Sequence, residues 1–360
     1  MQTIPLIQFG FGGVGRATVE RVLQAREDFE WRYGIRLSYV ALCDSQGAVV
    51  EPRGISFGNL NRLLAAKAEG QSIANASIGY RHEGLIDIVD VAGTTDAIVL
   101  DLTAEDETTD ALLLALERGY SAVLANKKPL TGPYENFRQL LSSNRLRYES
   151  TVGAGVPVIA TLRGNLIASH DTIHSIEGSL SGTLGYLTSG LQEGEAFSIL
   201  VHNAKALGYT EPDPRDDLGG MDVARKALIL ARTMGWTLEL DQIFVEPLYP
   251  ERLNQGSVDD FLLAISALDA DYRTSVAAAR THGNTLRYAV SLAGGAAEVG
   301  IKAVPLDSPL GRLQGSDNLV AFHSENYDDS PLVLQGRGAG VQGTAAGVLA
   351  NVVTLATQNA

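Results

Sequence analysis

The chain has 360 residues, of which 45% are hydrophobic and 19% charged, so it has enough apolar material for about two folded domains and is not disordered. Its net charge of −14 argues against a nucleic-acid partner, which needs a face rich in lysine and arginine. No apolar run approaches the ~18 residues that cross a bilayer, and the N-terminus lacks the basic start of a signal peptide. The single cysteine, Cys43, cannot form a disulfide within the chain. We therefore expect an acidic cytoplasmic protein with neither a membrane nor a nucleic acid among its partners.

Short apolar runs alternate with amphipathic stretches over the first 150 residues. Runs that are apolar throughout are typical of strands buried on both faces, and the stretches between them have helical periodicity. This alternation predicts an α/β fold with a doubly wound parallel sheet of the Rossmann type. The predicted strands cover residues 4–9, 37–43, 86–91, 97–102, 122–124 and 146–148, and the predicted helices cover 14–25, 59–68, 109–118 and 134–142.

The order of elements changes after residue 155. Strands and helices no longer alternate, which predicts a second, α+β domain with a mixed or antiparallel sheet. Predicted helices cover 156–168, 182–192, 197–207, 218–234 and 258–280, and predicted strands cover 172–180, 285–292, 297–304, 319–323 and 332–334. We expect a dinucleotide-binding domain at 1–150, a substrate-binding domain at 151–335, and a C-terminal segment at 336–360 whose helix returns to the first domain.

A glycine-rich loop follows the first predicted strand and opens the first predicted helix. It matches the pattern G-x-G-x-x-G, in which the glycines allow a tight turn, a close approach of pyrophosphate and close helix packing. The helix N-terminus adds amide donors and the positive end of a dipole. The loop therefore predicts dinucleotide binding by Gly10, Phe11, Gly12, Gly13, Val14 and Gly15.

An acidic residue, Asp44, stands at the end of the second predicted strand. An acid at this place usually accepts hydrogen bonds from the adenosine ribose, which favours NAD over NADP. Arg53 is close enough in sequence to contact a phosphate, so NADP stays open as an alternative.

Two further polar segments stand out. Lys127 and Lys128 follow the strand at 122–124, at the edge where open α/β sheets bind ligands. Residues 209–226 hold five carboxylates within twelve positions, and at their end Asp222 and Lys226 share a helix face. On physical grounds alone, the acidic segment fits a site for a small amino acid's ammonium group and a solvated surface equally well.

Taken together, these segments resemble the homoserine dehydrogenase family in its short form, without a kinase or regulatory domain. The resemblance rests on the glycine loop and on residues 126–129, 149–157, 175–184, 209–226, 315–318 and 338–347. It implies reversible conversion of L-aspartate 4-semialdehyde and NAD(P)H to L-homoserine, a step toward threonine and methionine. It also implies a homodimer formed through the sheet of the second domain, and no feedback inhibition through an appended domain.

The resemblance also implies roles for individual residues. Expected catalytic residues are Lys127, Lys226 and Asp217, with Asp217 orienting Lys226 or a water. Expected substrate contacts are Glu211, Asp222, Gly178 and Thr183. Further expected cofactor contacts are Thr103, Lys127 and Gly340. A monovalent cation, sodium, is expected at the Glu149 side chain and the carbonyls of Val152, Ala154 and Val156.

Two other functions fit parts of the pattern. An aspartate-semialdehyde dehydrogenase handles the same aldehyde but acylates a cysteine, and Cys43 lies on the adenosine side of the predicted sheet, away from that role. A dinucleotide-sensing binding protein would keep the fold without turnover. The presence of Lys127, Asp217 and Lys226 together argues against such a protein.

Overall fold

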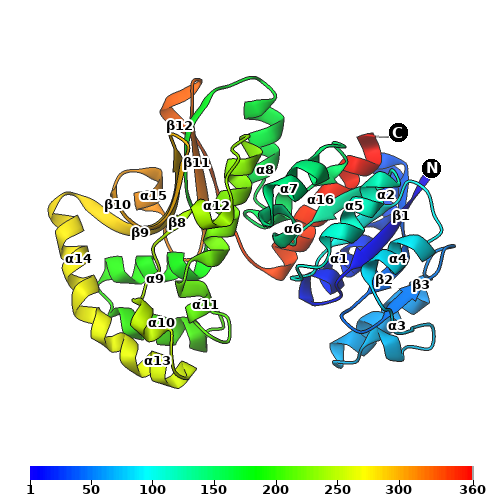
Figure 1. Ribbon diagram of the computed structural model, residues 1–360, viewed down its shortest axis with the longest axis horizontal. Coiled ribbons are helices and arrows are strands. Elements are labelled where there is room, and N and C mark those ends of the chain that lie inside the picture. Colours follow the sequence, from blue (N-terminus) through cyan, green and yellow to red (C-terminus); the bar gives the residue numbers. More distant parts are fainter. Residues whose placement is uncertain (359–360) are drawn as a thin grey trace. The chain divides into compact units, whose positions relative to one another are not determined.

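The computed structural model describes residues 1–358, which form two compact units. The first contains Met1–Gly155 and the C-terminal helix from Gly340, and the second contains Val156–Ala339. Within the described residues each unit has one six-stranded sheet (Figure 1). The predicted α/β class with a Rossmann-type first sheet is confirmed.

The first sheet has the strand order β3-β2-β1-β4-β5-β6. All its strand pairs are parallel except β2 with β3. The winding of the chain reverses between β1 and β4, and ligands of such sheets bind beside the carboxyl ends of the strands at that point. The strands are β1 (Gln2–Phe9), β2 (Ile35–Cys43), β3 (Ala48–Val50), β4 (Ile98–Asp101), β5 (Ser121–Leu124) and β6 (Leu146–Arg147).

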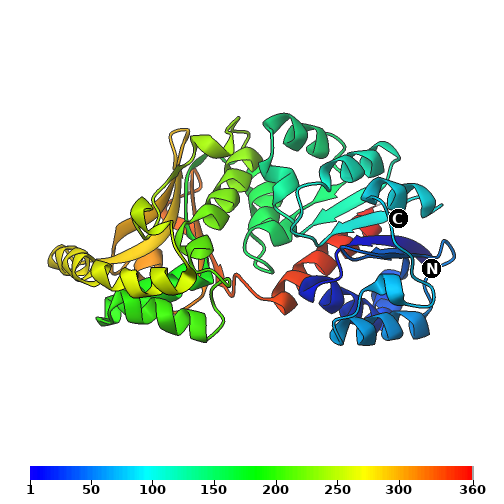
Figure 2. The same cartoon turned by 60° about the horizontal axis from the view of Figure 1, so that its bottom comes forward.

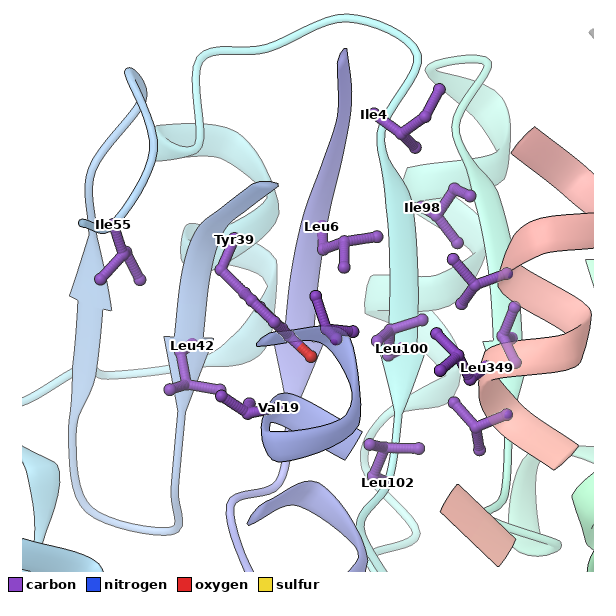
Figure 3. Packing of buried hydrophobic residues seen from close by; sticks show 14 of the residues in the cluster. Ile4, Leu6, Val19, Tyr39, Leu42, Ile55, Ile98, Leu100, Leu102 and Leu349 are labelled. Carbon is purple, nitrogen blue, oxygen red and sulfur yellow. The ribbon is translucent and has the colours of Figure 1, made fainter. Parts of the chain in front are cut away.

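The helices of the first unit include the last helix of the chain. Helix α16 packs beside α1, as both views of the ribbon show (Figures 1 and 2). Its Leu349 lies in one core with Leu6 of β1 and Leu100 of β4 (Figure 3). The helices are α1 (Gly13–Gln24), α2 (Arg26–Tyr33), α3 (Phe57–Ala68), α4 (Leu85–Val91), α5 (Thr109–Glu117), α6 (Lys128–Thr131), α7 (Tyr134–Leu141) and α16 (Val341–Gln358), with 3-10 turns at Ile73–Asn75 and Glu149–Thr151.

The prediction of a strand at 86–91 is wrong, because this segment forms helix α4. Ile88 and Val89 are fully buried, whereas Asp87 and Asp90 are exposed. Two adjacent buried residues between exposed ones fit a helix face and not the alternation of a strand. A short apolar run cannot distinguish the two by periodicity alone.

The second unit has a mixed sheet, as predicted, in the order β12-β11-β7-β9-β10-β8. Its strand pairs are antiparallel except β10 with β8. Helices α9, α12 and α14 pack on β9. The strands are β7 (Ile173–Ser179), β8 (Phe244–Val245), β9 (Asn284–Ala293), β10 (Ala296–Pro305), β11 (Asn318–Ser324) and β12 (Tyr327–Gly336).

The helices of this unit carry expected site residues, among them Thr183, Asp217 and Lys226. The predicted helix at 156–168 is a short α-helix that continues as a π-helix over Leu162–Ile167. The α-helices are α8 (Val158–Thr161), α9 (Gly182–Glu193), α10 (Phe197–Ala206), α11 (Arg215–Leu218), α12 (Met221–Thr233), α13 (Val258–Ala264), α14 (Asp269–Thr281) and α15 (Pro309–Arg312), and 3-10 turns lie at Leu240–Gln242, Glu251–Leu253 and Ile265–Leu268.

A buried arginine, Arg287 of β9, holds the segment around α15 against the sheet. Its side chain donates hydrogen bonds to the carbonyl oxygens of Leu310 at 3.0 Å, Gly311 at 2.9 Å and Leu313 at 2.7 Å. The residue is 1% exposed, and burial lowers the pKa of its guanidinium. Because a planar guanidinium has five N–H donors, one side chain can bind all three carbonyls.

Replacing this arginine should destabilise the chain. Arg287→Met leaves buried carbonyls without donors, and we expect the free energy of unfolding in urea to fall by about 2–4 kcal/mol. Arg273→Met on the exposed face of α14 is the control and should change it by less than about 0.5 kcal/mol. Equal effects of the two substitutions would contradict the role given to Arg287.

Candidate active site

The glycine loop lies between β1 and α1, at the carboxyl edge of the first sheet. Gly10 has φ +91°, and a Cβ there would lie 2.7 Å from the Leu102 carbonyl oxygen. Only glycine therefore fits where the loop crosses the end of β4. Gly12 is exposed, and a Cβ there would meet no atom within 4 Å. The loop thus leaves open space beside the N-terminus of α1, which suits a pyrophosphate.

The start of helix α16 lies against this loop. A Cβ at Gly13 would come within 3.2 Å of a Val341 methyl group, and Arg21 of α1 donates to the Gln342 side chain at 3.2 Å. Gly340, with φ +112°, accepts the amide of Thr344 at 3.0 Å in the first turn of α16. The structure therefore places Gly340 beside the glycine loop. Its contact with a cofactor remains a prediction.

Asp44 follows β2 and is 4% exposed at its side chain. Burial raises the pKa of its carboxyl, but hydrogen bonds, first among them that from Lys67, outweigh burial and lower the pKa to about 2. Five donors bind the two oxygens: Lys67 Nζ at 2.6 Å, the amides of Gln46, Gly47 and Ile73, and the Ser72 hydroxyl. A carboxylate has about four lone-pair sites, so these donors occupy its acceptor capacity. The expected ribose contact of Asp44 remains a prediction.

A second buried carboxylate, which the sequence analysis missed, lies at the end of β4. Asp101 is fully buried, and its oxygens accept the Thr103 amide at 3.1 Å, the Thr103 hydroxyl at 2.8 Å and the Asn126 amide group at 3.1 Å. Burial raises the pKa of this carboxyl. The sequence held one signal for this site, because Asp101 is a charged residue at the end of an otherwise apolar strand.

Asn126 connects this carboxylate to the segment that carries Lys127. Its Nδ2 also donates to the Glu105 carbonyl at 2.8 Å, and its Oδ1 accepts the Lys128 amide at 3.1 Å, at the start of α6. This network holds Thr103 at the carboxyl end of β4, and Lys127 lies between Asn126 and Lys128, which both belong to it. The side chain of Lys128 turns instead to Asp106 at 2.8 Å.

In the second unit the acidic segment forms a cluster around Asp217. Its Oδ2 accepts the backbone amide of Glu211 at 2.7 Å, and its Oδ1 lies 3.4 Å from the Thr183 hydroxyl. Thr183, from the first turn of α9, also donates to the Tyr209 carbonyl at 2.6 Å. Burial is the main cause that raises the pKa of Asp217 to about 6, and the negative charges of Glu211 and Asp222 add to it.

Lys226 projects from α12, with its side chain 12% exposed. Its Nζ donates to the Leu180 carbonyl at 2.7 Å and pairs with Asp222, one turn earlier, at 2.9 Å. Asp222, and not Asp217, therefore orients this amine, which differs from the expected arrangement. The Leu180 carbonyl was not expected either, because its approach depends on how β7 and α12 pack.

Gly178 has a clear packing reason to be glycine. A Cβ at this position of β7 would lie 2.8 Å from the Leu319 carbonyl oxygen of β11. Its expected substrate contact remains a prediction.

The turn after β6 contains the residues expected to hold a cation. Glu149 is buried, and Gly153 and Ala154 have φ +84° and +56°, so the backbone turns sharply there. The Ala154 carbonyl lies near α16, where a Cβ at Gly347 would come within 2.6 Å of it. The Val156 carbonyl already accepts the Val158 amide at 2.8 Å. Carboxylate and carbonyl oxygens are ligands that hard cations prefer, and the expected cation site at Glu149, Val152, Ala154 and Val156 remains a prediction.

The family model and the curated relatives of this chain indicate the same family. The family model of homoserine dehydrogenase matches residues 157–353. A bifunctional aspartokinase/homoserine dehydrogenase of Haemophilus influenzae is 33% identical over 358 residues, which are 98% of this chain and 43% of that protein. The chain spans about two fifths of the length of the curated relatives that it matches first.

Solved structures share the fold over nearly the whole chain. A Candida auris protein of unknown function has a TM-score of 0.85 and 30% identity, with 98% of each chain covered. A hyperthermophilic archaeal homoserine dehydrogenase in complex with NADPH has a TM-score of 0.77 and 23% identity, with 99% of this chain and 98% of that chain covered. These structures show that the fold is shared, and the family model and the curated relative bear out the resemblance inferred from the sequence.

Proposed function

The chain belongs to the homoserine dehydrogenase family, and we propose that it is an NAD(P)-dependent oxidoreductase that interconverts L-homoserine and L-aspartate 4-semialdehyde. The observation that carries this proposal is the Lys226 amine, held at 2.9 Å by Asp222 in a chain whose first unit has an open glycine loop. Such a reaction serves threonine and methionine biosynthesis.

Two lysines act on the reacting oxygen. A nicotinamide dinucleotide held at the glycine loop, Gly10 to Gly15, would supply or accept the hydride. Lys226 holds a proton at Nζ, gives it to the aldehyde oxygen in the reducing direction and takes it back in the oxidising direction. Lys127 is a second amine that stabilises negative charge developing on that oxygen. Asp222 keeps the Lys226 amine in place, since the two groups form a hydrogen-bonded ion pair.

The acidic cluster binds the amino-acid part of the substrate. Asp217 and Glu211 attract the ammonium group of homoserine, because two carboxylates close together favour a cation between them. The short hydrogen bond from the Thr183 hydroxyl to the Tyr209 carbonyl holds Thr183 beside Asp217. Gly178 lies on β7, the strand that leads into α9 and Thr183, and its backbone contacts the substrate.

Both NAD and NADP are accepted as cofactors. Lys67 neutralises Asp44, so the acid at the end of β2 repels a 2′-phosphate only weakly. The archaeal homoserine dehydrogenase of similar fold was solved with NADPH. Gly10 to Gly15, Thr103 and Gly340 supply the other contacts to the dinucleotide.

A monovalent cation, sodium, binds at the turn of Glu149, Val152, Ala154 and Val156. The support is the buried Glu149 carboxyl beside a sharply turned backbone.

The protein is a cytoplasmic homodimer. Phe244 of β8 and Tyr327 of β12 are exposed apolar side chains at the two edges of the second sheet, and they support a dimer interface formed through this sheet. Sedimentation equilibrium measures the mass of the assembly and so tests the dimer. No helix of residues 1–358 is long and apolar enough to cross a membrane.

The test is an assay of the purified chain with L-homoserine in alkaline buffer. We expect NAD⁺ and NADP⁺ each to be reduced, and the rate to be lower when tetramethylammonium replaces sodium. Phosphate-dependent oxidation of the aldehyde with no oxidation of homoserine would favour an aspartate-semialdehyde dehydrogenase. Tight binding of both dinucleotides with no turnover would favour a dinucleotide-sensing protein.

A further inference from the structure

A side chain of β1 lies on the sheet side of the glycine loop. Gln8 is fully buried, and its Nε2 donates to the Gly10 carbonyl at 2.9 Å and to the Gly15 carbonyl at 3.2 Å. These carbonyls belong to the first and last glycines of the G-x-G-x-x-G pattern. One amide group therefore joins both ends of the loop.

Tyr39 of the neighbouring strand β2 fixes the orientation of this amide. Its hydroxyl donates to Gln8 Oε1 at 3.0 Å, and the ring is 1% exposed. Figure 3 shows Tyr39 reaching from β2 across toward β1. Because the Gln8 oxygen accepts this hydroxyl proton, its NH₂ group must face the loop carbonyls. Burial raises the pKa of Tyr39, so the hydroxyl stays a donor over the working pH range.

The glycines leave room for this arrangement. A Cβ at Gly15 would lie 2.9 Å from Gln8 Nε2 and would clash with the Gly10 carbonyl. Gly12, in contrast, is exposed and meets nothing within 4 Å. The loop is therefore held from the sheet side, and its opposite side stays free for a ligand.

We propose that Gln8, oriented by Tyr39, is a positioning residue that presets the glycine loop for the pyrophosphate of the dinucleotide. This inference rests on the cofactor part of the proposed function. A buried polar side chain in a core strand is costly unless each of its groups is paired, and here the pairs are the loop itself and Tyr39. A loop held in its binding conformation loses less conformational freedom on binding, so affinity rises.

The test measures NADPH binding to the purified chain by fluorescence titration, without homoserine. Gln8→Met keeps the size of the side chain and removes both donors, and we expect the Kd for NADPH to rise roughly tenfold. Tyr39→Phe removes only the hydroxyl that orients the amide, and we expect a rise of about threefold. In steady-state assays the KM for the cofactor should rise in parallel, whereas kcat and the KM for homoserine stay within about twofold.

Tyr120→Phe is the matched control. Tyr120 is also buried in the first unit, and its hydroxyl donates to the Thr94 carbonyl at 2.8 Å, a partner outside the loop. We expect Tyr120→Phe to leave the Kd for NADPH unchanged. Wild-type affinity in both Gln8→Met and Tyr39→Phe, or an equal loss in Tyr120→Phe, would overturn the proposal.

The binding measurement separates this inference from the proposed reaction. A chain that binds NADPH but does not oxidise homoserine would contradict the reaction, and its variants would still report on Gln8. If Gln8→Met fails to fold, the Kd of Tyr39→Phe decides, because that substitution adds no atom and deletes only one buried hydroxyl.

Discussion

Lys226→Met should lower kcat for homoserine oxidation by about 10²–10⁴-fold, the range typical of a lost general acid–base group. The substitution keeps the length of the side chain and removes the amine that exchanges a proton with the substrate oxygen. We expect the Kd for NADPH to change by less than about twofold, because the amine contacts Leu180 and Asp222 of its own unit. Steady-state kinetics and a separate cofactor titration measure the two effects.

Two further substitutions sharpen this prediction. Lys226→Arg keeps a positive charge, but a guanidinium hardly releases its proton, so it should restore little of the lost kcat. Arg225→Met, one position earlier on α12, should leave kcat within about twofold of wild type. A Lys226→Met variant with wild-type kcat would remove this residue from the mechanism.

The activity should fall as the pH drops through about 6, because Asp217 then takes up a proton. Burial raises its pKa to about 6 from the ordinary value of 3.8, and the protonated carboxyl no longer attracts the substrate ammonium. We expect kcat/KM for homoserine to show an acid limb near pH 6. Asp217→Asn should remove that limb and raise the KM for homoserine by about 10–100-fold, the cost of losing a hydrogen bond to a charged group.

The same shift fixes the sign of a stability effect. Because the folded chain holds this proton more tightly than the unfolded chain, the contribution of Asp217 to the free energy of unfolding falls as the pH rises from about 4 to about 6.

Asp216→Asn, on the exposed side of α11, is the control for the activity prediction and should keep both the acid limb of the pH profile and the KM for homoserine. An acid limb that persists unchanged in Asp217→Asn would assign it to another group.

Local sequence pattern was enough to locate the glycine loop and the strand that precedes it. One reason that the loop needs glycine is local, the positive φ of Gly10. The segment at 86–91 was mispredicted because six residues hold too few periods to distinguish a strand from a helix. Its burial in the fold decided between them.

The contacts at the site that were not predicted join residues that lie far apart in the sequence. Lys67 neutralises Asp44 from 23 positions away, and Tyr39 reaches Gln8 across 31 positions. Both contacts follow from packing between elements, β2 against α3 and β1 against β2, which one sequence does not encode locally. The Leu180 carbonyl that holds Lys226 is 46 positions away and has no side-chain signature at all.

Transfer of deuterium tests the proposed reaction most directly. L-Homoserine deuterated at its carbinol carbon is incubated with NADP⁺ and the purified chain, and the nicotinamide product is analysed by NMR and mass spectrometry. We expect deuterium to appear at C4 of the reduced nicotinamide, and Lys226→Met to suppress formation of this product. Reduced nicotinamide without deuterium, or no reduction with either dinucleotide, would contradict hydride transfer from homoserine.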